Sequence, residues 1–151
     1  MPTAFKRLLL LLSLLLLAGC ARPAAALEFV TLARGHHSGI KEPTAVLITD
    51  QKGWEGHWRR HASIFVPPPP PPPVDFRTAS VVALHLGERR TGGYSVIITA
   101  VKRADGALHV VAAERSPAPG SPVTMALTQP YHIIRVERVK PGTRLQVELG
   151  G

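Results

Sequence analysis

The sequence predicts an α+β fold that is mostly β, with an antiparallel sheet or sandwich and one packed helix at about residues 50–62. Short apolar segments rich in β-branched residues recur along the chain, and each is bounded by Gly, Pro, Asp or Ser. Helical spacing is clear only in residues 50–62, where Trp54 and Trp58 lie one helical turn apart. We therefore expect strands to form the core and the tryptophans to attach the helix to it.

The N-terminal segment has the composition of an export signal. Lys6 and Arg7 precede a leucine-rich stretch at residues 8–17, which is too short to span a bilayer. This stretch leads into Leu17-Ala18-Gly19-Cys20, which resembles the lipobox of bacterial lipoproteins, where the cysteine is lipidated and becomes the new N-terminus. We expect residues 1–19 to be a lipoprotein signal peptide and Cys20 to carry lipid such as palmitate. The alternative is an ordinary secretory signal that leaves a free thiol.

This signal sets the expected organisation and location of the protein. Residues 20–26 form a short lipidated tether, and residues 27–150 form a single domain. Cys20 is the only cysteine, which excludes an intrachain disulfide and a multi-cysteine metal site. The net charge of +8 would attract anionic lipid headgroups or an acidic partner, unless it is simply a solvated basic surface. We expect an exported protein anchored to a membrane of the cell envelope, with no nucleic acid as partner.

The strands are expected on both sides of the helix. Residues 27–32 and 45–49 precede it, and a loop at 34–43 separates these two strands. Asp50 is the expected N-cap of the helix, and burial of the tryptophans must hold the helix because its two glycines weaken it. The strands expected after the helix are 80–86, 94–102, 107–114, 123–127, 131–139 and 144–149, with turns at 104–106 and 140–143.

Seven consecutive prolines at residues 67–73 follow the helix. They cannot donate backbone hydrogen bonds, and they favour polyproline II, which is extended and stiff. We interpret them as a rigid connector. The alternative is a ligand for an aromatic-lined groove.

No catalytic motif is complete in the sequence. Residues 87–93 have the glycine spacing of a phosphate-binding loop, but they lack its lysine and a following helix. Ser38 is displaced by one position from the centre of a nucleophile elbow, with His36 or His37 as the conceivable base. His57 and His61 are spaced like a metal-binding pair but lack the glutamate and a third ligand. We expect no enzyme activity, no cofactor and no metal, and keep a metal-dependent hydrolase as a minor alternative.

Several separated motifs point to one protein family. They are Trp54 and Trp58 with His61, Val74-Asp75-Phe76, Thr91-Gly92-Gly93-Tyr94 and Pro130-Tyr131. Together they resemble the PrcB family, in particular its C-terminal domain, over about residues 30–139. The resemblance implies an accessory, protein-binding role in a surface protease complex. It also implies structural roles for Trp54, Trp58, His61, Asp75, Phe76, Pro130 and Tyr131.

The loop Glu88 to Ser95 is the expected partner-binding site. Gly92 and Gly93 would allow a tight bend with positive φ, which explains part of the loop by geometry alone. A rigid hairpin would hold Arg89 and Arg90 outward, where guanidinium groups can pair with carboxylates of another protein. The expected binding residues are Arg89, Arg90, Thr91, Gly92, Gly93 and Tyr94. Because Thr-Gly-Gly-Tyr also resembles a loop of chagasin-type cysteine protease inhibitors, a loop-inserting protease inhibitor is the alternative.

Overall fold

The computed structural model describes residues 24–151. The predicted signal peptide, Cys20 and the first part of the predicted tether lie outside the described residues. The elements in chain order are β1 (Ala25–Ala26), β2 (Phe29–Gly35), β3 (Thr44–Ile48), α2 (Gln51–His61), a 3₁₀ turn (Ala62–Ile64), β4 (Ala79–His85), β5 (Ser95–Ala104), β6 (Ala107–Arg115), β7 (Tyr131–Glu137) and β8 (Arg144–Gly150).

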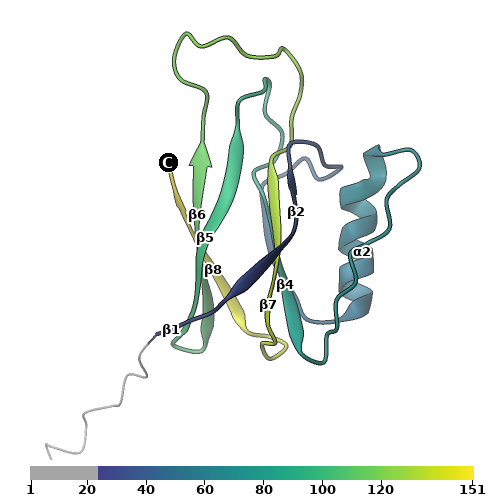
Figure 1. Cartoon of the computed structure of the whole chain (residues 1–151), viewed down its shortest axis with the longest axis vertical. Coiled ribbons are helices and arrows are strands. Elements are labelled where there is room, and N and C mark those ends of the chain that lie inside the picture. Colours follow the sequence, from purple (N-terminus) through teal and green to yellow (C-terminus); the bar gives the residue numbers. More distant parts are fainter. Residues whose placement is uncertain (1–23) are drawn as a thin grey trace, which may run out of the picture.

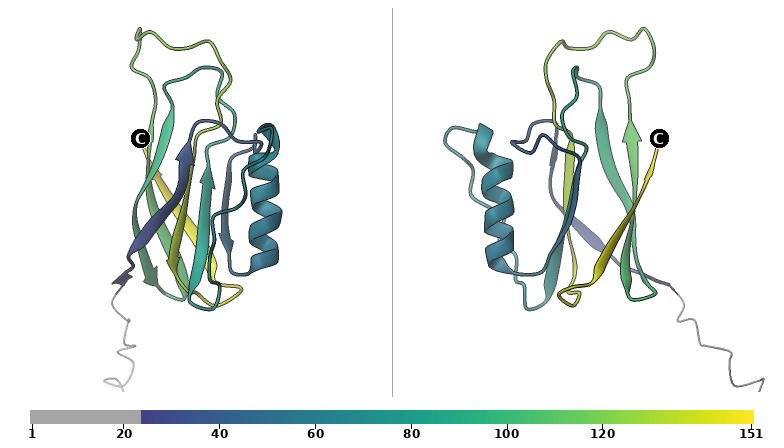
Figure 2. Two further views of the ribbon diagram at one scale, coloured as in Figure 1. Left: turned by 45° about the vertical axis from the view of Figure 1, so that its right-hand side comes forward. Right: turned by 180° about the vertical axis from the view of Figure 1, so that it is seen from behind.

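The strands form two four-stranded sheets, with the orders β1-β5-β6-β8 and β2-β7-β4-β3. The sheets face each other, and α2 covers the outer face of the second one (Figures 1 and 2). Pairing is antiparallel except between β6 and β8, which run parallel because the intervening β7 belongs to the other sheet. The predicted fold class, mostly β with one packed helix, is confirmed.

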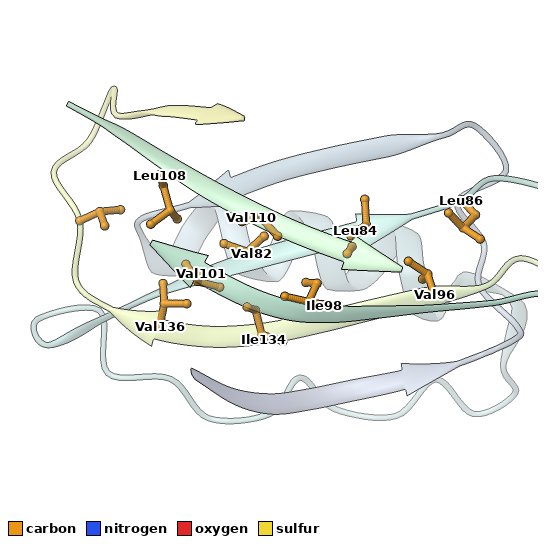
Figure 3. Close-up of a cluster of buried hydrophobic side chains, with 12 residues drawn as sticks. Val82, Leu84, Leu86, Val96, Ile98, Val101, Leu108, Val110, Ile134 and Val136 are labelled. Carbon is orange, nitrogen blue, oxygen red and sulfur yellow. The ribbon is translucent and has the colours of Figure 1, made fainter. Parts of the chain in front are cut away.

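Two apolar cores hold these layers together. The sandwich core lies between the sheets (Figure 3) and contains Val82, Leu84, Leu86, Val96, Ile98, Val101, Leu108, Val110, Ala112, Ile134, Val136 and Val139. The helix-side core contains Ile48, Trp54, Trp58, Ala62, Val81, Ala83 and Ile133. β4 contributes to both cores and is buried along its whole length. This two-sided burial explains why its central residues 81–84 are all apolar and do not alternate with polar ones.

The polyproline segment packs along helix α2. The indole N–H of Trp58 donates a 2.8 Å hydrogen bond to the carbonyl of Pro69, and that of Trp54 donates a 3.0 Å bond to the carbonyl of Pro72. Carbonyls three residues apart lie on the same side of a polyproline II helix, which has three residues per turn. The segment is therefore both a connector and a ligand for an aromatic surface, and that surface belongs to the chain's own helix.

The structure differs from the sequence prediction in three segments. The strand expected at 123–127 is absent, and these residues belong to a long connection, residues 116–130, between β6 and β7. The first expected strand is displaced towards Gly35, where the absence of a side chain lets the ring of Tyr131 pack closely. In addition, Ala25 and Ala26 of the predicted tether form β1.

The two ends of the sandwich carry different features (Figure 1). At the end that we call basal, Ala25 of β1 pairs with Arg103 near the end of β5. At the opposite end, which we call distal, residues 86–94 lead into Ser95, the first residue of β5, and residues 116–130 lie beside them. No helix within residues 24–151 is long and apolar enough to cross a membrane.

Candidate partner-binding surface

Residues 86–94 connect the two sheets, since β4 and β5 lie in different sheets. They are therefore not the tip of a hairpin. The backbone of Arg89 pairs with that of Thr128 through bonds of 2.7 and 2.9 Å, and the N–H of Gly92 donates to the carbonyl of Thr124 at 2.9 Å. The hydroxyl of Thr128 also donates to the carbonyl of Thr91 at 2.8 Å. These bonds join residues 86–94 to the 116–130 connection.

The two glycines of this loop are required for different reasons. Gly93 has φ +89°, a conformation that disfavours other residues. Gly92 is needed because a Cβ there would clash with the side chain of Thr124. The expectation of positive φ therefore holds for Gly93, whereas Gly92 serves the close approach of the neighbouring connection.

Arg89 points into the protein, which corrects the expectation that both arginines extend outward. Its guanidinium donates to the carbonyl of Leu86 at 2.8 Å and to the carboxylate of Glu114 at 3.0 Å. It also lies 5.6 Å from the ring centroid of Tyr94. Arg89 and Tyr94 thus fix the loop from within, and Arg90 is the exposed arginine.

The exposed residues between the two backbone anchors form a candidate binding surface. Residues 125–127 lie between the anchored Thr124 and Thr128, and Arg90 lies opposite them on the other loop. The side chains of Met125 and Leu127 are 87% and 55% exposed. Apolar side chains that are held out by a well-bonded backbone are typical of interaction sites. We call Arg90, Met125 and Leu127 the distal surface; of these, only Arg90 was among the residues predicted from sequence.

A second group of polar residues is buried between α2 and the sheet. The hydroxyl of Ser38 lies 3.0 Å from Nδ1 of His61 and 3.5 Å from Nδ1 of His85. Nε2 of His57 and Nε2 of His85 lie 3.1 Å apart. Burial lowers the pKa of His57 and of His61 to about 4, and that of His85 to about 3. The folded protein therefore keeps all three imidazoles neutral at pH 7.

The serine of this histidine cluster is shielded from solvent. Ser38 is 1% exposed, and its oxygen accepts the N–H of Ile40 at 3.1 Å. The histidines beside it are His61 and His85, which differ from the bases considered in the sequence, His36 and His37. Within residues 24–151, no group of three His, Cys, Asp or Glu side chains could hold a metal ion. The clue available in the sequence was His85, a polar residue that directly follows the apolar residues 81–84.

The remaining predicted structural residues lie around these two regions. The ring of Tyr131 packs with its edge against His61, with centroids 4.4 Å apart. Asp75 pairs with Arg77 and accepts backbone bonds at the start of β4, and Phe76 packs against the helix-side core. The carbonyl of Pro130 accepts the N–H of Leu86 at 2.9 Å.

The chain folds as a small β-sandwich domain. At its distal end, residues 86–94 and the 116–130 connection are hydrogen-bonded to each other, and they carry the distal surface. Residues 80–137 match the family model described as PrcB C-terminal, and this match supports the assignment of that segment to the PrcB family. The matched segment runs from β4 to the end of β7 and contains the whole distal surface, whereas α2 lies before it. No curated protein and no solved structure shows significant similarity to the chain.

Proposed function

We propose that the protein is a membrane-anchored, non-enzymatic accessory protein of the bacterial cell envelope. It binds another envelope protein through the distal surface, as a subunit of a protease complex. The observation that carries this proposal is the pair of joined connections that hold Arg90, Met125 and Leu127 outward within the segment matched by the family model.

The chemistry of the distal surface indicates the kind of partner. Met125 and Leu127 would bury apolar area in a pocket of the partner, and Arg90 would pair with a carboxylate at its rim. Because the backbone on both sides is already hydrogen-bonded, little backbone conformational entropy would be lost on binding. The partner surface is thus expected to be an apolar depression with acidic residues beside it.

The orientation of the domain supports the same proposal. The chain enters the fold at Ala25, at the basal end, and Cys20 precedes Ala25 by only a few residues. A lipid on Cys20 would therefore place the basal end near the membrane and direct the distal surface away from it. A partner anchored in or near the same envelope could then reach Arg90, Met125 and Leu127.

Substitution of the distal surface tests this function. The lipidated protein with Arg90→Ser, Met125→Ser and Leu127→Ser should capture its partner from its own membranes at least about tenfold less well, because buried anchors each contribute on the order of 1 kcal/mol or more. A matched control replaces exposed apolar residues elsewhere, Val30→Ser and Leu149→Ser, and should retain capture. Quantitative mass spectrometry of crosslinked complexes measures both. Equal recovery with the triple variant would remove the distal surface from the function.

The alternative, a loop-inserting protease inhibitor, has less support. Such an inhibitor needs residues 91–94 free to enter an active-site cleft. Instead, Thr91 and Gly92 are bonded to the 116–130 connection, and His36 bonds to the carbonyl of Tyr94 at 3.0 Å. Met125 and Leu127 are exposed apolar side chains. They favour docking on the surface of another protein over insertion of residues 91–94 into a cleft.

A further inference from the structure

The basal end carries a group of exposed cations from three strands that are distant in sequence. They are Lys102 and Arg103 at the end of β5, Arg138 and Lys140 after β7, and Arg144 at the start of β8. The register brings these strand ends together, since Arg103 pairs with Ala25 and Arg144 pairs with Ala107, the first residue of β6. Within residues 24–151, none of the five takes part in a salt bridge. Their charges are therefore available to an external anion.

Three of these cations line one open cavity at the basal end. Arg103, Arg138 and Lys140 lie around a space of about 520 Å³, together with Ala25, Thr143 and the carboxylate of Asp105. The guanidinium of Arg103 is positioned by a 3.2 Å hydrogen bond to the carbonyl of Arg138. One carboxylate against three cations leaves the cavity positive. The cavity is large enough to admit a phosphate group with its ester substituents.

We propose that this basal cavity binds the phosphate headgroup of an anionic phospholipid. Guanidinium groups form paired hydrogen bonds with phosphate oxygens, and cations beside an anionic bilayer are attracted to it within a Debye length. Ala25, through which the chain enters the fold, lines the same cavity. The proposal rests on the membrane anchoring in the proposed function, because a lipid at Cys20 would lie at most about 20 Å of extended chain from Ala25. The headgroup contact would hold the domain in one orientation, with its distal surface away from the bilayer.

Binding of unlipidated protein to vesicles tests the cavity independently of the anchor. The chain from residue 20 with Cys20→Ser retains both cores, whose residues lie between 27 and 147. It should sediment with vesicles that contain phosphatidylglycerol and not with pure phosphatidylcholine, and added salt should release it. The variant Arg103→Gln, Arg138→Gln, Lys140→Gln should bind at least roughly tenfold less well.

A control variant with the same loss of charge separates the cavity from net charge. Arg59→Gln, Arg60→Gln, Arg115→Gln removes three exposed cations outside the basal end and should bind vesicles like the parent. Thermal melts check that all three proteins remain folded. Equal weakening by both triple variants, or equal binding to neutral vesicles, would overturn the proposal. Binding of millimolar inorganic phosphate to the cavity without any binding to phosphatidylglycerol vesicles would assign the cavity to a free anion and would also overturn the proposal.

Failure of this test is distinguishable from failure of the proposed function. Capture of the partner depends on the distal surface and is measured with lipidated protein. Lipidation of Cys20 is measured by the mass of the mature protein. Vesicle binding of the Cys20→Ser chain depends on neither of them.

Discussion

The free energy of unfolding should fall steeply as the pH is lowered from about 6.5 towards about 4, and the protein should unfold in this range. Burial lowers the pKa of His57 and His61 to about 4 and that of His85 to about 3, whereas the unfolded chain titrates near 6.5. The folded protein keeps these histidines neutral, and the resulting contribution to the free energy of unfolding is fully present above pH 6.5. This contribution is lost as the pH falls through the pKa values of the folded state. Each excluded proton steepens the dependence by about 1.4 kcal/mol per pH unit.

His132 adds to this acid sensitivity through its position between the sheets. Burial lowers its pKa to about 4. Its Nδ1 accepts the N–H of Ile98 at 2.8 Å, and its Nε2 lies 2.8 Å from the hydroxyl of Thr31. A protonated imidazole has no acceptor nitrogen, so protonation would break the bond to Ile98 and leave a buried N–H unsatisfied.

Urea titrations at a series of pH values measure the acid effect. His57→Gln should reduce the slope of unfolding free energy against pH by about one proton, because it removes one of the excluded groups. His37→Gln is the matched control, since His37 is exposed, and should leave the slope unchanged. A free energy of unfolding that stays constant between pH 7 and 4.5, or a slope that is the same in His57→Gln, would show that the buried histidines do not exclude protons.

Replacing Trp54 with alanine should destabilise the protein by about 3–5 kcal/mol. Trp54 is 0% exposed and fills the helix-side core beside Trp58, with ring centroids 5.2 Å apart. Its removal leaves a cavity and also frees the carbonyl of Pro72, which loses its indole donor. Since the segment 67–73 is held on the helix by the two indoles, the loss should extend to the packing of the polyproline segment.

Two further variants identify the source of this loss. Trp54→Phe keeps an aromatic ring and removes the N–H donor, and should cost about 1–2 kcal/mol. Lys52→Ala changes an exposed residue of the same helix and should cost less than about 0.5 kcal/mol. Chemical denaturation measures all three proteins. A cost below 1 kcal/mol for Trp54→Ala would mean that α2 is not attached to the sheet through this ring.

Much of the fold could be predicted because single residues carry strong local signals. Asp50 begins the helix as expected, since its carboxylate accepts the N–H of Gly53 at 2.8 Å, and both tryptophans are buried. The predicted hairpin turn at Asp105-Gly106 joins β5 to β6. A turn also forms at Pro141-Gly142, but it joins strands of different sheets, so the expectation of a hairpin there is wrong. Each of these signals depends only on residues that are close together in the sequence, so the sequence alone is enough to predict them.

The parts that could not be predicted depend on contacts between distant residues. Whether Arg89 points inward is decided by Glu114, which lies on another strand. The segment 123–127 has strand-like composition, but Thr124 accepts the N–H of Gly92 and the adjacent Thr128 pairs with Arg89, which leaves no partner strand for a ladder. The contact between Ser38 and His61 joins a loop to the helix, and the spacing of these two residues in the sequence does not predict it. The candidate binding surface consequently moved from residues 89–94 to Arg90 with Met125 and Leu127.

Site-specific photocrosslinking tests whether the distal end of an anchored domain binds another protein. A photoreactive amino acid is placed at position 125 of the full chain in the cells that produce it, and at position 148 on the exposed face of β8 as the comparison. Position 125 should give one discrete crosslinked protein, and position 148 should not give it. The same products from both positions, or no protein adduct from position 125, would contradict the account.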